Sequence, residues 1–238
     1  ELACGRSPEA AAHSLTEAYG VAPDKARLLV ITAANERRLL TRLPVDQPLL
    51  YLNIPFCPSR CSYCSFSCGT VAEHKINLDE YVDGVIAEIR QLGPCFKRQV
   101  SAVYIGGGTP TVLSAKQLQR LLAALTSEIP VVPDYEFTIE AGRADTIDAA
   151  KLSVMRAAGV NRICINPQTL QDETLQRIGR RHSSHDWFFA YQAARSAGFA
   201  VINADLIAGL PGETAVDFMA SLNTLFEAGP ENITIHTL

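Results

Sequence analysis

The chain has 238 residues, 47% of them hydrophobic, so it can bury the core of a single domain or of an α/β barrel. Its formal net charge is −4, and basic residues are scattered among acidic ones, which excludes the basic face typical of nucleic-acid-binding proteins. No stretch approaches the roughly 18 uninterrupted apolar residues of a membrane span. Seven cysteines, an odd number, and no secretion signal favour a reducing cytoplasm. The expected partner is therefore a small-molecule substrate.

The first part of the chain reads as a helical leader. Residues 8–43 are rich in Ala and Leu with charges at helical spacing, and the pattern is interrupted at residues 19–23, which predicts two helices. Residues 44–48 read as a linker, so we expect residues 1–47 to form a helical leader and linker and residues 48–238 to form the main domain. The missing initiator Met and the end of the chain near a strand lead us to expect a truncated piece of a longer protein.

The main domain alternates two kinds of segment. Short apolar runs rich in Val, Ile and Tyr predict strands over 49–54, 101–105, 135–140, 161–165, 200–206 and 232–236. Amphipathic stretches between them predict helices over 78–92, 114–127, 146–157 and 213–227. This alternation indicates βαβ units, a parallel sheet and right-handed crossovers, arranged as an open doubly wound sheet or as part of a barrel.

The distinctive residues follow the predicted strands. In both architectures the functional loops lie at the carboxyl ends of the strands. A cysteine loop follows the first strand, Gly106-Gly-Gly-Thr-Pro110 follows the second, and Glu140 ends the third. Gln168 follows the fourth strand, and Gly209-Leu-Pro-Gly-Glu213 follows the fifth. We therefore expect one site at this edge of the sheet.

The cysteine loop carries Cys57, Cys61 and Cys64 at C-x3-C-x2-C spacing. Close thiolates in one loop can converge on an iron–sulfur cluster or on zinc. A structural zinc site needs a fourth ligand, which Cys68 or His74 could supply. Unligated thiols are the third alternative. The position at a strand end favours the cluster, because three cysteines leave one iron open to a substrate or cofactor.

The cysteine spacing, with Tyr63 before the last cysteine, resembles the signature of radical S-adenosylmethionine enzymes. The resemblance implies that Cys57, Cys61 and Cys64 hold a 4Fe–4S cluster whose free iron binds S-adenosylmethionine. One electron from the cluster then cleaves this cofactor to a 5′-deoxyadenosyl radical. An electron donor for the cluster is also implied, and so is a partial (β/α)6 TIM-like barrel.

Longer strings resemble the oxygen-independent coproporphyrinogen III oxidase group of this superfamily. They are Tyr51-x-x-Ile-Pro-Phe-Cys57 and Gly106-Gly-Gly-Thr-Pro-Thr111, and the resemblance runs from about residue 48 to the end. The segments beginning at Ile139, Asp205 and Ile233 look closest to the HemZ-type branch. The glycine run lacks the G-x-G-x-x-G pattern and the Gly-Lys-Ser/Thr of a P-loop, so it does not indicate nucleotide-phosphate binding.

The same resemblance implies a cofactor pocket. Each candidate also has a structural interpretation: the glycines as a tight turn, Glu140 as a solvated strand end, Gln168 as a turn residue and Arg180 as a solvated base. Asp205 lies inside an apolar strand, where an unpaired charge is costly. The residues implied to bind the cofactor are Tyr51, Tyr63, Gly107, Gly108, Thr109, Glu140, Gln168, Arg180 and Asp205.

The implied reaction is the oxidative decarboxylation of coproporphyrinogen III to protoporphyrinogen IX in haem biosynthesis. This chain departs from the group at one position. The classical oxidases carry a fourth cysteine where this chain has Phe66, and Cys68 follows two positions later. Related haem chaperones also lack that cysteine. A haem-trafficking protein of the same fold is therefore the alternative, and a porphyrinogen or haem is the expected ligand.

Overall fold

The computed structural model describes residues 5–41, 47–71 and 76–238. The chain forms two compact units, residues 1–47 and residues 48–238. In the first unit, helix α1 (Pro8–Tyr19) begins at the Ser7 cap and ends at Gly20 in the left-handed conformation, and α2 (Pro23–Leu40) begins with proline. The predicted linker at residues 44–48 falls mostly outside the described residues.

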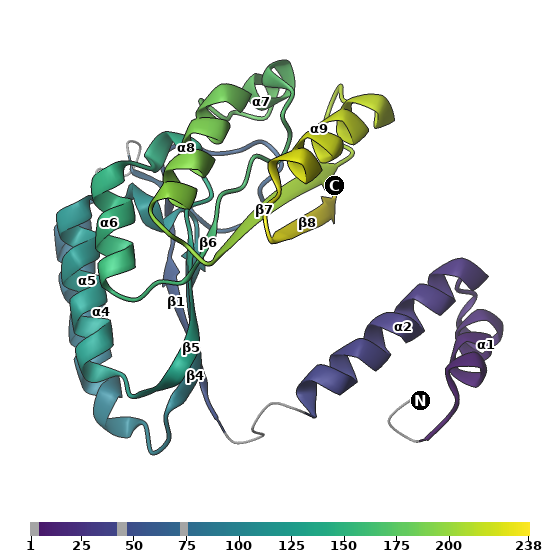
Figure 1. The fold of residues 1–238 in the computed structure, drawn as a ribbon, viewed down its shortest axis with the longest axis horizontal. Coiled ribbons are helices and arrows are strands. Elements are labelled where there is room, and N and C mark those ends of the chain that lie inside the picture. The colour runs from purple at the N-terminus through teal and green to yellow at the C-terminus, as the bar shows by residue number, and fades with distance from the viewer. Residues whose placement is uncertain (1–4, 42–46, 72–75) are drawn as a thin grey trace. The chain divides into compact units, whose positions relative to one another are not determined.

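The second unit is built on a parallel sheet of six strands in the order β1-β4-β5-β6-β7-β8 (Figure 1). This architecture confirms the α/β expectation of a partial (β/α)6 barrel. Two further short strands, β2 (Phe56–Cys57) and β3 (Gly69–Thr70), pair beside it. The six strands are β1 (Leu49–Ile54), β4 (Val100–Gly107), β5 (Val131–Glu140), β6 (Arg162–Cys164), β7 (Val201–Ala208) and β8 (Asn232–Thr237).

Amphipathic helices cover the sheet. In Figure 1 they follow the strands around one face. Apart from Leu175, which belongs to a smaller second cluster, their buried hydrophobic residues join those of the strands in one core. Polar caps begin several of them, including Ser114 and Thr214, whose side chains accept hydrogen bonds from backbone amides. The helices are α4 (Leu78–Leu92), α5 (Ala115–Glu128), α6 (Ala149–Ala157), α7 (Asp172–Arg177), α8 (Ser184–Ser196) and α9 (Ala215–Ala228).

The four helices expected from periodicity are present, with bounds that differ by no more than three residues. Helix α6 begins later than expected because Ala144–Thr146 forms a 3-10 turn and Asp148 caps the helix. Helices α7 and α8 lie in a stretch for which no helix was expected. In α8 aromatic side chains occupy the buried face, and Trp187 and Tyr191 are almost inaccessible to solvent.

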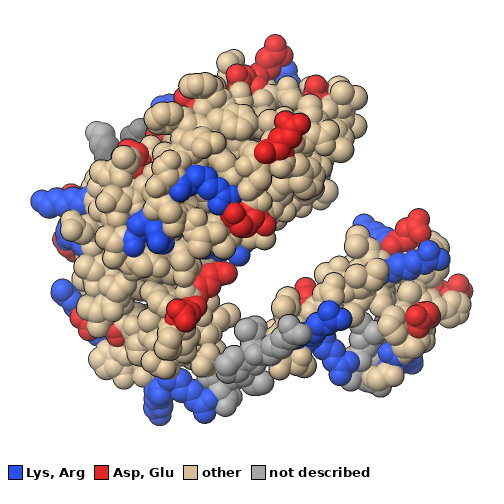
Figure 2. All heavy atoms as spheres, viewed as in Figure 1, with Lys and Arg blue, Asp and Glu red and all other residues tan. Residues whose placement is uncertain are grey.

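The surface of the second unit carries side chains of both charges. On the face of residues 48–238 drawn in Figure 2, Lys and Arg lie interspersed with Asp and Glu. Among the described residues, no helix is long and apolar enough to cross a membrane.

Candidate cofactor site

A cavity of about 510 Å³ lies at the carboxyl ends of the strands. Its volume falls in the range of about 300–1,000 Å³ that is typical of small-molecule sites. Parallel strands bring their carboxyl ends to one edge, so residues far apart in the sequence meet here. Of the twelve residues expected at the site, eleven line the cavity: Cys57, Cys61, Tyr63, Cys64, Gly107, Gly108, Thr109, Glu140, Gln168, Arg180 and Asp205.

Tyr51 is the predicted residue that lies outside this cavity. Its side chain is 59% exposed and lines a separate groove with α4. The ring stacks on Tyr104 with 5.8 Å between the centroids. The Tyr104 hydroxyl in turn donates a hydrogen bond to Glu140 Oε1 at 2.5 Å. Tyr51 therefore lies behind Tyr104, which contacts the site directly.

The cysteine loop is folded back on itself by backbone contacts. Strands β2 and β3 pair so that Cys57 lies opposite Thr70, which brings Cys68 to the same cavity. The Cys64 amide donates to Cys61 O at 3.2 Å, and the Thr109 hydroxyl lies 3.5 Å from Cys57 Sγ. The four thiols of the cysteine loop thus face one cavity, and His74, the other expected zinc ligand, lies outside the described residues.

Burial and neighbouring thiols disfavour the ionisation of Cys57 and Cys68. Burial raises the pKa of Cys57, and the neighbouring Cys61 and Cys64 raise it further. Burial also raises the pKa of Cys68 to about 11, together with Cys57 and Cys64. A bound metal would offset this repulsion, because thiolates are the ligating form of cysteine.

The thiols of the loop fit the cysteine ligand set of an iron–sulfur cluster, because they line one cavity. Among the described residues, no three His, Cys, Asp or Glu side chains are grouped closely enough to hold a single metal ion. In a cubane cluster each cysteine binds a different iron, so its ligands surround a volume instead of converging on a point. Cys57, Cys61 and Cys64 lie around a common cavity in this way, and the residues present fit the cluster.

The glycine turn is required by packing against the cysteine loop. The amide of Gly108 donates to Ile54 O and that of Thr109 donates to Phe56 O, both at 2.8 Å. A Cβ atom on Gly108 would lie 2.5 Å from Phe56 O. Gly107 has a φ of 109°, and a Cβ there would lie 2.0 Å from Asn53 Oδ1. The tight-turn interpretation therefore explains these glycines, and the turn holds strand β4 against the first cysteine.

Glu140 is a half-buried acceptor at the end of β5. Burial raises the pKa of Glu140 and Asp205 adds to the rise, while the hydrogen bond from Tyr104 lowers it. Asp205 accepts a hydrogen bond from Asn203 Nδ2 at 2.6 Å and lies 3.6 Å from His236 Nε2. Both carboxylates line the cavity, where they can accept hydrogen bonds from hydroxyl or amino groups of a ligand.

Gln168 occupies a strained backbone position. Its φ is 69°, a region that residues other than glycine rarely adopt, and its amide donates to Asp205 O at 2.9 Å. The buried atoms Gln168 Oε1 and Asn166 Oδ1 have no hydrogen-bond partner among the described residues. Strain and unpaired acceptors in a cavity wall are typical of ligand sites.

Arg180 is 6% exposed and braces the wall beside the cysteines. Its Nη1 donates to Gly142 O at 2.8 Å and to Asn166 O at 2.7 Å, and its Nη2 donates to Tyr63 OH at 3.0 Å. Burial raises the pKa of Tyr63 to about 12, although Arg180 opposes the rise. Arg180 is therefore not the solvated base of the structural interpretation, and it can present positive charge to a ligand carboxylate.

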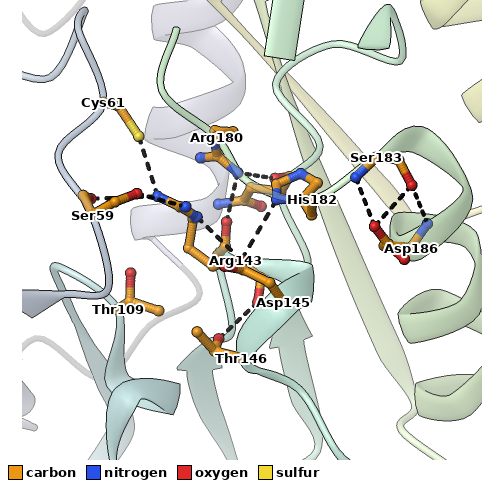
Figure 3. A network of polar contacts seen from close by, with 12 residues as sticks. Ser59, Cys61, Thr109, Arg143, Asp145, Thr146, Arg180, His182, Ser183 and Asp186 are labelled. Atoms are coloured by element: carbon orange, nitrogen blue, oxygen red, sulfur yellow. Dashed lines mark hydrogen bonds and ion pairs between the residues drawn. The ribbon is translucent and has the colours of Figure 1, made fainter. Parts of the chain in front are cut away.

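Other residues of the site were not expected from the sequence. Arg143 is 2% exposed and lies 3.5 Å from Cys61 Sγ through Nη1. Figure 3 shows this side chain pointing toward Ser59 and Cys61, with Asp145 and His182 on its other side. The position after β5 was the one available signal, because polar residues at strand ends face the site. Further unexpected lining residues are Tyr104, Arg162, Cys164, Asn166 and Asn203.

Comparisons with known proteins agree with this geometry. Residues 52–225 match the family model described as the radical SAM superfamily. A relative from Bacillus subtilis (strain 168), the oxygen-independent coproporphyrinogen-III oxidase-like protein HemZ, is 35% identical over 247 residues, covering 100% of this chain and 49% of that protein. Heme chaperone HemW of the same strain is 35% identical over 190 residues, covering 79% of this chain and 49% of that protein.

Among solved structures, coproporphyrinogen III oxidase (HemN) from Escherichia coli superposes with a TM-score of 0.73 and 33% identity. The match covers 80% of this chain and 44% of that one. The chain thus spans about half the length of the curated relatives it matches. A 4Fe–4S cluster and S-adenosylmethionine are the cofactors of the superfamily, and the three cysteines and the cavity fit them. The chain therefore belongs to the radical SAM superfamily, among relatives named HemZ, HemW and HemN.

Proposed function

We propose that this protein is a radical S-adenosylmethionine enzyme acting on a porphyrinogen. Cys57, Cys61 and Cys64 would hold the 4Fe–4S cluster, and S-adenosylmethionine would occupy the cavity beside it. The observation that carries the proposal is that three cysteines and the polar ends of five strands line one cavity. When bound, the cluster and S-adenosylmethionine would supply the radical chemistry, and the protein would bind and orient them.

The chain's own residues would bind the cofactor by charge and hydrogen bonding. Arg180 offers a cation for a carboxylate, while Glu140 and Asp205 offer acceptors for amino and hydroxyl groups. Gln168 Oε1 is an unpaired acceptor that a ligand donor would satisfy. Gly107, Gly108 and Thr109 shape the cavity wall beside Cys57, and Tyr51 would support it from behind Tyr104.

The reaction that we propose is the oxidative decarboxylation of coproporphyrinogen III to protoporphyrinogen IX. Its support is the similarity to HemZ over the whole of this chain and to HemN over most of it. Free thiols support a cytoplasmic location, since none of the six described cysteines forms a disulfide bond with another described cysteine. A one-electron donor would reduce the cluster.

A haem-carrying role is the second candidate. Its support is the 35% identity to heme chaperone HemW and the presence at the cavity of Phe66, which is 62% exposed. An exposed aromatic ring beside a cavity can pack on the face of a flat macrocycle. In this role the protein would bind haem and leave coproporphyrinogen III unchanged.

One assay separates the two candidates. The full-length protein is reconstituted without oxygen and given coproporphyrinogen III, S-adenosylmethionine and dithionite, and the porphyrins are separated by chromatography. The oxidase proposal predicts loss of carbon dioxide and accumulation of protoporphyrinogen IX. Formation of 5′-deoxyadenosine without decarboxylated product would contradict the oxidase activity, and haem binding measured by absorbance would then support the carrier.

A further inference from the structure

Arg143 carries a buried positive charge whose placement packing alone does not explain. The residue is 2% exposed, and a buried charge is costly unless it is paired and hydrogen-bonded. Its Nη2 donates to Ser59 Oγ at 2.9 Å, and its Nη1 lies 3.4 Å from Ser59 O and 3.5 Å from Cys61 Sγ. One guanidinium thus contacts both the backbone and the terminal cysteine of the Cys57–Cys61 loop (Figure 3).

Asp145 holds the guanidinium from the other side. Arg143 Nε lies 3.3 Å from Asp145 Oδ1, and His182 Nδ1 lies 3.7 Å from the same oxygen. Burial alone would raise the pKa of Asp145, but His182 and Arg143 together hold it at about 2. Asp145 is therefore an anion near neutral pH, and the Arg143 fork is fixed between this anion and the cysteine loop.

A fixed cation at a cysteine sulfur changes the energy of a bound cluster. Reduction adds one negative charge, and hydrogen bonds or positive charge at the ligating sulfurs stabilise the reduced form. Arginine keeps its charge at every working pH, and the low dielectric of a buried site weakens screening of that charge. The 3.5 Å contact to Cys61 places Arg143 where this effect is large.

We propose that Arg143 is a positioning residue that fixes the Cys57–Cys61 loop and raises the reduction potential of the cluster. The inference rests on the proposed function, because it requires a cluster on these cysteines. Arg143 acts through Cys61 and Ser59. Asp145 sets the position of the guanidinium and partly offsets its charge.

The test is an EPR-monitored redox titration of the reconstituted full-length protein. Arg143→Gln removes the cation, so its cluster is expected at a more negative potential than the wild-type cluster. Arg143→Lys keeps the charge without the planar fork, and its potential is expected between those two. Asp145→Asn removes the offsetting anion, so its cluster is expected at a more positive potential. Loop disorder alone would not shift these variants in opposite directions.

Arg156→Gln is the matched control, since Arg156 is a half-buried arginine in α6 whose guanidinium donates to Val160 O and which does not line the cavity. Its cluster is expected at the wild-type potential. Equal potentials for wild type and Arg143→Gln, or a negative shift in Asp145→Asn, would overturn the role of Arg143. If Arg143→Gln retains no cluster, the role of Arg143 is tested by Asp145→Asn, whose cluster potential is expected to shift in the positive direction. A wild-type protein that takes up no cluster would overturn the proposed function itself.

Discussion

Two carboxyl groups close together in the sequence have opposite electrostatic environments. Burial and the nearby Asp205 raise the pKa of Glu140 at the end of β5. Five residues later, His182 and Arg143 outweigh burial and lower the pKa of Asp145 to about 2. Glu140 faces the cavity, whereas Asp145 is paired behind the cysteine loop. Glu140 is therefore suited to contact a ligand, and Asp145 is suited to stabilise the site.

Asp145 should contribute to stability in a defined pH window. Its pKa in the folded protein lies below the ordinary value of 3.8, so its contribution is present above about pH 4 and is lost as the pH falls toward about 2. Urea unfolding of wild type and Asp145→Asn should show the wild type more stable near neutral pH, with the difference shrinking through this window. A difference that stays constant from neutral pH to about pH 2 would contradict the pairing.

Gly108 should tolerate no side chain. The Cβ of Gly108→Ala would lie 2.5 Å from the backbone oxygen of Phe56, so we expect a loss of about 1–3 kcal/mol in the free energy of unfolding. Gly84→Ala is the matched control, because an added Cβ in helix α4 meets nothing within 4 Å and alanine stabilises a helix by about 0.5–1 kcal/mol. Denaturant titration of both variants measures the two effects. Equal stability of the two variants would contradict the packing argument.

At the scale of elements, the cysteine loop is hydrogen-bonded to the connection between α7 and α8. The Ser62 amide donates to Ile178 O and the Ser59 hydroxyl donates to Gly179 O, each at 3.1 Å. Gly179 has a φ of 79°, and a Cβ there would lie 2.8 Å from Arg60 O. This connection contacts residues 59–62 of the loop, whereas the glycine turn contacts residues 54 and 56.

Gly179→Ala should therefore weaken cluster binding. Its control is Gly198→Ala, which has a φ of 81° and no atom within 4 Å of the added Cβ. Both variants bear the cost of alanine in the left-handed region, about 1–2 kcal/mol. Only Gly179→Ala also displaces the cysteine loop. Iron and sulfide analysis after reconstitution should show a loss of cluster in Gly179→Ala alone. Equal loading of both variants would contradict a role of the Gly179 contact in positioning the cysteine loop.

Periodicity in the sequence was sufficient for the long elements. The amphipathic pattern of α4 and the apolar runs of β4 and β7 predict their positions, because burial of one face dominates their energy. Helix α7 has six residues, too few for a periodic signal, and α8 carries three adjacent aromatic residues, Trp187, Phe188 and Phe189, that obscure its buried face.

The sequence predicted those site residues that lie at the ends of strands. Parallel pairing brings such ends together, which explains why Glu140, Gln168 and Asp205 meet the cysteines. The contact between Arg143 and Cys61 joins positions 82 residues apart. It depends on the exact path of two loops, which no local pattern encodes. The exposed position of Tyr51 likewise depends on its being on the edge strand β1.

At the scale of the whole molecule, we propose a domain boundary between residues 47 and 48. Among the described residues, the large hydrophobic core draws its buried members from Leu52 to Leu225, which all belong to the second unit. Removing residues 1–47 should therefore leave the second unit folded, with a thermal midpoint close to that of the longer protein. Calorimetry and circular dichroism check this expectation, and loss of cooperative unfolding would contradict the boundary.

We propose, as the central claim, that the cavity at the strand ends binds a 4Fe–4S cluster and S-adenosylmethionine. Cys95 is exposed and lies outside the cavity, so Cys95→Ala serves as the control for Cys61→Ala. The most direct test is to reduce the anaerobically reconstituted protein with dithionite in the presence of S-adenosylmethionine and to measure 5′-deoxyadenosine. We predict that wild type and Cys95→Ala form it and that Cys61→Ala does not. A wild-type protein that forms none, or a Cys61→Ala variant that forms as much as wild type, would contradict the account.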